Sequence, residues 1–126
     1  MSAREPRDVR VLVTGAGGPA AIAVIKSLRA DPSVSLIAAD MDNWAAGLYL
    51  VPPADRTLIP SGLTPEFAAE LLARCQELRA SIVIPTVDAE LRPLAAARRS
   101  FEDAGIGLML PPEHALSVTL DKLALA

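Results

Sequence analysis

Residues 9–20 read VRVLVTGAGGPA. The first six are an apolar, β-branched run, which predicts a buried strand over residues 9–14. Gly15, Gly17 and Gly18 follow in a loop, and Pro19 suits the first helical position because its missing N–H would have no helical partner there. We expect that helix to end near Ala30. A strand, a glycine loop and a helix in this order are typical of the first unit of a Rossmann-like domain.

The remaining chain repeats the same alternation. Further strands are predicted at residues 34–39, 56–59, 81–84 and 106–110. Helices are predicted at residues 43–50, 64–78 and 90–103, with Asn43, Thr64 and Glu90 as caps, and again at 113–126. The strands are continuous apolar runs, as expected for strands buried on both faces. The predicted fold is therefore α/β, a Rossmann-like doubly wound parallel sheet of about five strands in three layers.

Composition limits the classes of function. The 126 residues fall in the usual single-domain range of about 100–150. A net charge of −3 gives no electrostatic basis for binding nucleic acid or an anionic membrane. One cysteine excludes an internal disulfide, and we find neither a signal-peptide pattern nor a membrane-spanning run. We therefore expect a cytoplasmic protein. With one histidine, His114, no metal site is expected.

Ligands of open parallel sheets bind at the carboxyl ends of the strands. Three loops should meet there, at residues 15–20, 40–43 and 85–90. The first is a GxGxxA variant of the dinucleotide fingerprint, and Asp40 is placed to accept hydrogen bonds from a ribose. This predicts an NAD(P)-binding domain of a dehydrogenase or epimerase. Pro19 argues against it, because the pyrophosphate is held by backbone N–H groups at the helix start and proline has none. A glycine turn needed only for packing is the other alternative.

The third loop carries two acids just past a buried strand. With Glu90 as the helix cap, residues 86–90 would form an exposed loop over the edge of the sheet. Asp88 and Glu90 would then be placed to bind a cationic or amine group of a substrate. The alternative is that one of them caps the helix and interacts favourably with its dipole.

The same loop, IPTVDAEL at residues 84–91, resembles the N-terminal domain of ATP-grasp proteins of the carbamoyl-phosphate synthase large-subunit type. VLVTGAGG at 11–18 resembles the opening strand and loop of that family, and ADMD at 39–42 resembles the end of its second strand. Asp121-Lys122 resembles the dipeptide at which the ATP-grasp region begins. The resemblance extends over nearly the whole chain from Val9.

The resemblance implies an ATP-dependent carboxylate–amine ligase that forms an acyl phosphate, with this domain on the substrate side. ATP and Mg²⁺ would bind downstream of the Asp-Lys pair, so the fragment alone would hold no cofactor and no catalytic residue. We accordingly expect a disordered tail at residues 1–8, a pre-ATP-grasp domain at 9–118 and the truncated start of the ATP-grasp region at 119–126. The candidate ligand-binding residues are Gly15, Gly17, Gly18, Asp40, Asp42, Thr86, Asp88 and Glu90.

The expected partners are a small-molecule substrate and the downstream ATP-grasp domain, with a homo-oligomer as an open alternative to a monomer. The sequence leaves the identity of the acid and the amine unassigned. It also leaves a third class of function open, a non-catalytic module that serves only packing or assembly.

Overall fold

The computed structural model describes residues 9–110 and contains one sheet of five parallel strands. The spatial order of the strands is β3-β2-β1-β4-β5. Their bounds are β1 (Val9–Val13), β2 (Val34–Asp40), β3 (Arg56–Leu58), β4 (Ile82–Ile84) and β5 (Gly107–Leu108). All pairings are parallel, with Val9 opposite Val34 and Val11 opposite Ile82. The predicted fold class is therefore confirmed.

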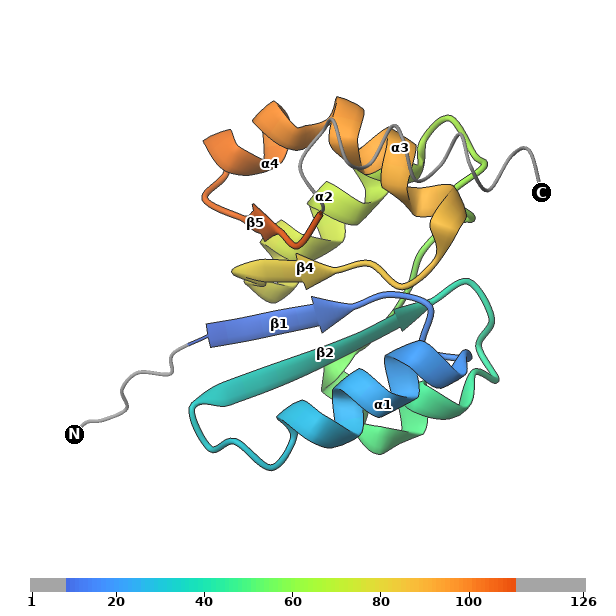
Figure 1. Ribbon diagram of the computed structural model, residues 1–126, viewed down its shortest axis with the longest axis vertical. Coiled ribbons are helices and arrows are strands. Elements are labelled where there is room, and N and C mark those ends of the chain that lie inside the picture. Colours follow the sequence, from blue (N-terminus) through green and yellow to red (C-terminus); the bar gives the residue numbers. More distant parts are fainter. Residues whose placement is uncertain (1–8, 111–126) are drawn as a thin grey trace.

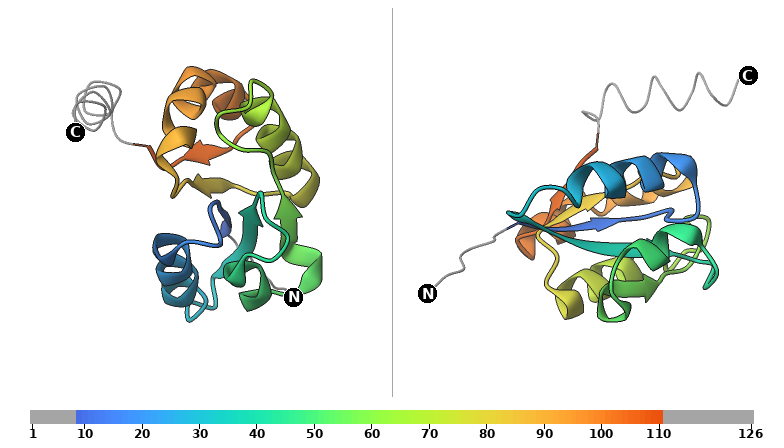
Figure 2. Two further views of the ribbon diagram at one scale, coloured as in Figure 1. Left: turned by 90° about the vertical axis from the view of Figure 1, so that its right-hand side faces the viewer. Right: turned by 90° about the horizontal axis from the view of Figure 1, so that it is seen from below.

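Helical segments cover both faces of the sheet (Figures 1 and 2). One face carries α1 (Pro19–Leu28) and the 3₁₀ helix η2 (Ala46–Leu50). The other carries α2 (Phe67–Leu78), α3 (Asp88–Ala96) and α4 (Arg98–Asp103). A second 3₁₀ turn, η3 (Pro53–Asp55), leads into β3. The chain thus changes face after β3, which leaves the carboxyl ends of β1 and β4 side by side at the middle of the sheet.

Alternate residues of β1 supply two separate hydrophobic cores. Leu12 packs on the α2 side, where Phe67 and Phe101 are fully buried. Val11 and Val13 pack on the opposite side, against helix α1. Because side chains of a strand alternate between faces, a continuous apolar run fills both cores at once.

Two predicted helix starts are wrong by two or three residues. Thr64 and Pro65 lie in a turn, and α2 begins at Phe67 instead. Asn43 caps no helix: η2 follows Ala45, whose side chain makes no capping hydrogen bond. One side of α2 is apolar, and Phe67, Leu71 and Cys75 are buried on it.

The helix predicted over residues 90–103 begins earlier and consists of two pieces. α3 begins at Asp88, and α4 follows it after a break at Ala97, where ψ is 7° rather than helical. Acidic residues in the first turn favour the earlier start through the helix dipole. Glu90 is consequently not the cap, and Pro93 lies inside the helix instead of in its first turn.

The expected tail at residues 1–8, the helix at 113–126 and the domain boundary after 118 lie outside the described residues. Within residues 9–110, no helix is both long and apolar enough to cross a membrane.

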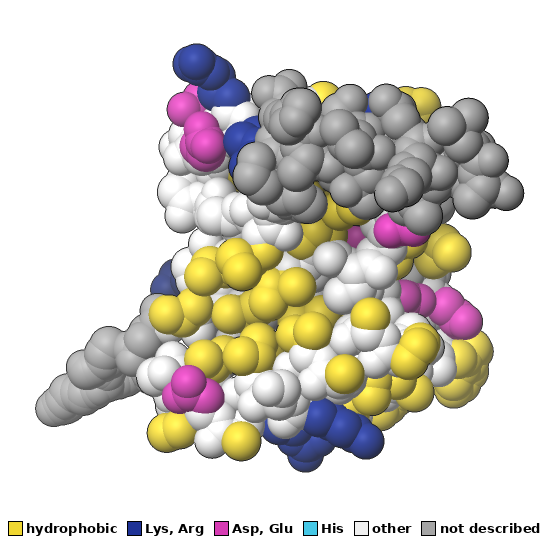
Figure 3. Space-filling view, in the orientation of Figure 1, with side chains coloured by type: hydrophobic (Ala, Val, Ile, Leu, Met, Phe, Trp, Pro, Cys, Tyr) yellow, Lys and Arg dark blue, Asp and Glu magenta, His cyan; other side chains and the backbone are white. Residues whose placement is uncertain are grey.

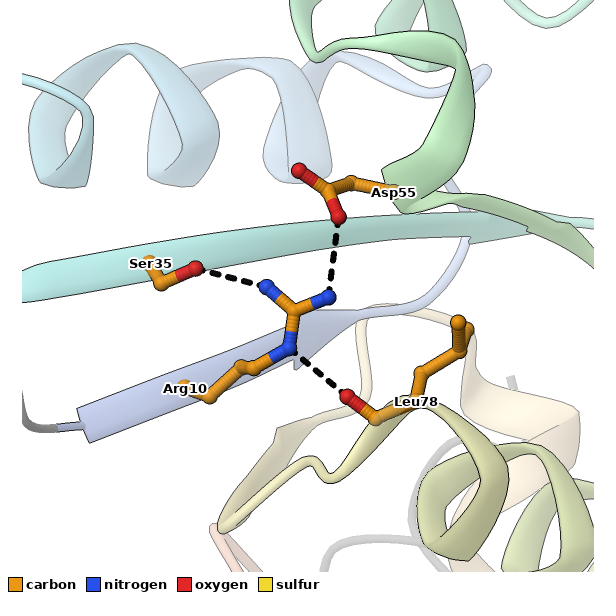
Figure 4. Close-up of polar contacts among 4 residues, drawn as sticks. All are labelled: Arg10, Ser35, Asp55 and Leu78. Carbon is orange, nitrogen blue, oxygen red and sulfur yellow. Dashed lines mark hydrogen bonds and ion pairs between the residues drawn. The ribbon is translucent and has the colours of Figure 1, made fainter.

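An arginine holds together the amino-terminal edge of the sheet (Figure 4). Arg10, in β1, donates from Nε to the carbonyl oxygen of Leu78 at 2.7 Å and from the guanidinium to Ser35 Oγ at 2.6 Å. A third bond, of 2.8 Å, joins it to Asp55 Oδ1. The Arg10 and Asp55 side chains are only 26% and 25% exposed. One side chain therefore connects β1, β2, η3 and the end of α2.

We expect Arg10→Met to lower the free energy of unfolding by about 2–3 kcal/mol, because the Asp55 carboxylate and the Leu78 carbonyl lose a charged donor. Urea unfolding at neutral pH measures this. Arg29→Met, at an exposed arginine just after α1, is the matched control and should change stability by less than about 0.5 kcal/mol. Equal effects of the two substitutions would show that the cluster around Arg10 contributes little.

Candidate functional site

A pocket of about 250 Å³ opens at the carboxyl edge of the sheet. Its wall is formed by Gly15 after β1, by Asp40 and Met41 at the end of β2, and by Glu90 in α3. The segment after β3 closes the remaining side. The full lining is Gly15, Asp40, Met41, Ile59, Pro60, Ser61, Gly62, Leu63, Val87, Ala89 and Glu90. This is the edge at which the sequence predicts that the loops meet.

Glu90 is bound to the loop after β1 through a pair of threonines. Thr14 Oγ1 donates to Glu90 Oε1 at 2.5 Å and accepts from the backbone N–H of Thr86 at 3.0 Å. Thr86 Oγ1 donates in turn to the carbonyl oxygen of Thr14 at 2.9 Å. Thr14 is fully buried and Glu90 is only 4% exposed. The loops after β1 and β4 are thus joined by reciprocal side-chain bonds, with a carboxyl group at their centre.

Burial raises the pKa of the Glu90 carboxyl from 4.5 to about 7. The negative charge of Asp40 raises it further, while the hydrogen bonds from Thr14 and from the backbone of Val87 oppose both effects. A carboxyl removed from water favours its neutral form unless a positive charge comes near. This buried acid, which lines the same pocket as a second acid, is therefore suited to accept a cation.

Asp40 organises the neighbouring loop with both of its oxygens. Oδ2 accepts from the backbone N–H of Asp42 at 2.9 Å, and Oδ1 accepts from that of Gly17 at 3.4 Å. Asp42 in turn accepts from the N–H of Trp44 at 2.9 Å. Asp40 is half-buried in the pocket wall, whereas Asp42 is exposed and lies outside the lining. Asp42 shapes the turn, and Asp40 faces the pocket.

Three backbone N–H groups of the glycine loop already have partners within the protein. The N–H of Ala16 bonds to the carbonyl of Ala39 at 3.0 Å, and that of Gly18 bonds to Gly15 at 2.9 Å. The Gly17 N–H points to Asp40, and Pro19 at the helix start has none. A pyrophosphate would need these groups free. The loop is therefore built for close packing: at Gly17 an added Cβ would lie only 3.2 Å from Ala45 Cβ.

This arrangement predicts that neither NADH nor NADPH binds the chain at millimolar concentration. Nicotinamide fluorescence during titration measures it. Saturable binding of either cofactor, lost in Asp40→Asn, would favour the dehydrogenase or epimerase alternative instead.

The structure separates the two acids of the third loop. Asp88 is exposed in the first turn of α3, outside the pocket lining, where its charge interacts favourably with the helix dipole. Glu90, expected on an exposed loop, is buried two residues further along the same helix. Thr86 reaches the site through Thr14, and Gly18 lies away from the lining. Of the eight candidate residues, Gly15, Asp40 and Glu90 line the pocket.

Sequence reasoning missed the wall that follows β3. Residues 59–63 line the pocket, and none of them was among the candidate ligand-binding residues. Gly62 lies against α3 so closely that an added Cβ would be 2.8 Å from the carbonyl oxygen of Ala89. Pro93, four residues after Ala89, has no N–H to offer that oxygen, so the helix carbonyl is left open to this approach. The sequence feature that could have indicated this wall is its place in the chain, because the segment also follows the carboxyl end of a strand.

Apolar side chains surround the mouth of the pocket. Met41, Leu63 and Val87 all contribute to the lining and are exposed. Within residues 9–110, no three His, Cys, Asp or Glu side chains are grouped to hold a metal ion. The pocket thus combines two carboxyl groups with an apolar rim, which suits an organic cation.

A family model, described as the PylC-like N-terminal domain, matches residues 11–109. No curated protein matches the chain. The matched range begins inside β1, contains the other four strands in full, and includes every residue that lines the pocket. The chain belongs to the PylC-like N-terminal domain family, and is an N-terminal domain of the kind associated with ATP-grasp ligases.

Proposed function

We propose that this chain is the substrate-side domain of an ATP-dependent carboxylate–amine ligase, and that its pocket holds the ammonium group of a substrate. The observation that carries the proposal is Glu90, a buried carboxyl group that lines the same solvent-open pocket as Asp40. Family membership supplies the ATP-grasp context. The resemblance of residues 84–91 to carbamoyl-phosphate synthases favours chemistry through an acyl phosphate.

In such a ligase, ATP phosphorylates a carboxylate, and a nitrogen nucleophile displaces phosphate from the acyl phosphate. ATP and Mg²⁺ would bind to the region that follows Asp121-Lys122. The present chain would only position the substrate. Asp40 and Glu90 would orient it, and neither would transfer a proton in the reaction. The chain by itself is accordingly not catalytic.

Electrostatics explains why an ammonium group suits this pocket. Two carboxyl groups that line one pocket repel when both are charged, and a cation bound near both removes that cost. The ammonium would shift Glu90 to its charged form, so binding near neutral pH would release part of a proton. Exposed Met41 and Leu63 would contact the carbon chain of the substrate. The backbone N–H groups of the glycine loop would support the walls without contacting the ligand.

The proposed partners follow from this role: a small amine-bearing substrate and the ATP-grasp domain of the same enzyme. We further propose a cytoplasmic location and no interaction with nucleic acid or membrane, in line with the net charge of −3.

The test uses the complete gene product. Its reading frame should continue beyond Ala126 into an ATP-grasp region, and the purified protein should release phosphate from ATP only when a carboxylate and an amine are both supplied. A panel of diamines, amino acids and monoamines identifies the substrate class. A reading frame that stops at Ala126, or phosphate release that is indifferent to amines, would contradict the proposal.

A further inference from the structure

A second pocket, of about 240 Å³, opens beside the edge strand β3. Its walls come from η2, η3, β3 and the loop after β2, and it shares no lining residue with the pocket that contains Glu90. The two pockets also differ in charge. Acidic side chains lie along the right-hand side of Figure 3, where the strands of Figure 1 end, and the first pocket opens at this edge. Within residues 9–110, Arg56 is the only charged residue that lines the second pocket.

The guanidinium group of Arg56 is held in place from two directions. Nε donates to the carbonyl oxygen of Leu48 at 2.6 Å, with a longer bond of 3.3 Å to that of Val51. The guanidinium carbon lies over the Tyr49 ring, 4.4 Å from its centroid. The Tyr49 hydroxyl donates to the carbonyl oxygen of Asn43 at 3.0 Å, which fixes the ring in turn. A ligand would therefore meet an arginine that has already lost much of its side-chain freedom.

The two terminal nitrogens of Arg56 are open to a ligand. Across residues 9–110, neither Nη1 nor Nη2 makes a hydrogen bond, and no carboxylate forms an ion pair with Arg56. Asp55, its neighbour in the chain, is bound to Arg10 at 2.8 Å instead. Arg56 itself is half-buried. A partly desolvated guanidinium group gains charge-assisted hydrogen bonds when an anion binds to it.

Charge and volume indicate which anion the pocket suits. A carboxylate carries one negative charge and accepts two parallel hydrogen bonds from the planar guanidinium group. A phosphate carries about 1.5–2 negative charges near neutral pH, and no second Lys or Arg of the described residues lines the pocket. Pro53 and Leu58 supply an apolar wall, and Leu58 is 51% exposed. Because ligand pockets usually measure about 300–1,000 Å³, a volume of about 240 Å³ suits a small ligand.

We propose that the pocket around Arg56 binds the anion of a small carboxylic acid with a short carbon chain. The carboxylate accepts hydrogen bonds from Nη1 and Nη2 of Arg56, and the carbon chain lies against Pro53 and Leu58. The pocket is thus a second ligand site, opposite in charge to the one that contains Glu90. This proposal is independent of what the first pocket binds and of the ligase reaction.

Titration of the 126-residue chain with butyrate, followed by NMR of its N–H groups at constant ionic strength, tests the proposal. We expect saturable chemical-shift changes at the Arg56 Nε–H and at the backbone amides of Asn43 and Leu58, with a Kd of about 1–10 mM. Acetate has a shorter carbon chain and should bind about threefold or more weakly. Chloride at the same ionic strength should produce no saturable change at these positions.

Two substitutions separate the shape of the guanidinium group from its charge. Arg56→Gln keeps an N–H donor for the Leu48 carbonyl and should raise the Kd for butyrate by about tenfold or more. Arg56→Lys keeps the charge but lacks the planar pair of donors, and it should raise the Kd by about fivefold. Arg29→Gln, at the exposed arginine just after α1, is the matched control and should keep the wild-type Kd.

Three results would overturn the proposal. The first is a set of butyrate shifts that does not saturate or that chloride reproduces, which the wild-type chain shows even if Arg56→Gln fails to fold. The second is an unchanged Kd in Arg56→Gln. The third is saturable binding of inorganic phosphate without binding of butyrate, which would make this a phosphate site. Equal Kd values for acetate and butyrate, or for Arg56→Lys and wild type, would each contradict the contacts assigned to the ligand.

Discussion

Glu90→Gln is expected to remove about 3 kcal/mol of pH dependence from the free energy of unfolding. The pKa of this carboxyl is about 7 in the folded protein and 4.5 in a solvated reference, and each pKa unit corresponds to about 1.4 kcal/mol. The folded protein binds this proton more tightly than the unfolded chain does. The contribution of Glu90 to the free energy of unfolding is therefore fully present below pH 4.5 and is lost as pH rises to about 7. The wild-type protein should therefore lose stability over this range relative to the variant.

Urea unfolding of both proteins at several pH values between 4 and 8 measures the difference. Asp88→Asn is the matched control: it neutralises an exposed carboxyl in the same helical turn and should keep the wild-type dependence. A difference between wild type and Glu90→Gln that is constant with pH would mean that Glu90 is not held in a desolvated position.

Gly15→Ala is expected to destabilise the domain by about 2–4 kcal/mol. Gly15 has φ of +63°, and an L-residue pays about 1 kcal/mol or more to adopt it. The new Cβ would also overlap the Thr86 hydroxyl and lie 2.7 Å from Val87 Cγ2. The hydroxyl cannot move freely because it is bonded to the carbonyl of Thr14. Strain and overpacking therefore act together, and the connection between the loops after β1 and β4 should weaken.

Gly18→Ala, in the same loop, provides the control. Its Cβ would come no closer than 3.6 Å to the nearest atom, the carbonyl oxygen of Gly15, so we expect a change below about 0.5 kcal/mol. Thermal and urea unfolding of both variants decide the point. Comparable losses at the two positions would show that the loop as a whole, and not the Gly15 position, limits stability.

The sheet could be predicted from sequence because buried parallel strands carry their own signature. Residues 9–14 and 34–39 are continuous apolar runs bounded by Gly and Asp, and such runs have few other stable arrangements. The order of such strands along the chain is enough to predict the fold class. Helix starts were less predictable, because the Thr64 and Glu90 expectations relied on cap preferences that tertiary packing overrides.

The place where the loops meet was predictable, but the residues that line the pocket there were predictable only in part. Loops after parallel strands meet at one edge, which identified Gly15, Asp40 and Glu90. Local sequence could not show that Glu90 would be buried and Asp88 exposed, because that difference depends on α3 starting two residues before Glu90. The role of Thr14 as partner of Glu90, 76 residues away, and the cluster around Arg10 likewise depend on long-range contacts that no local pattern encodes.

The measurement that tests the central claim most directly is the Michaelis constant for the amine substrate in the complete gene product, with Asp40→Asn and Glu90→Gln compared with wild type. We predict that each substitution raises KM by about tenfold or more while kcat changes by less than about twofold, because only binding is affected. Asp88→Asn should leave both constants unchanged. A KM for the amine that is the same in all four proteins would contradict the assignment of this pocket to the substrate.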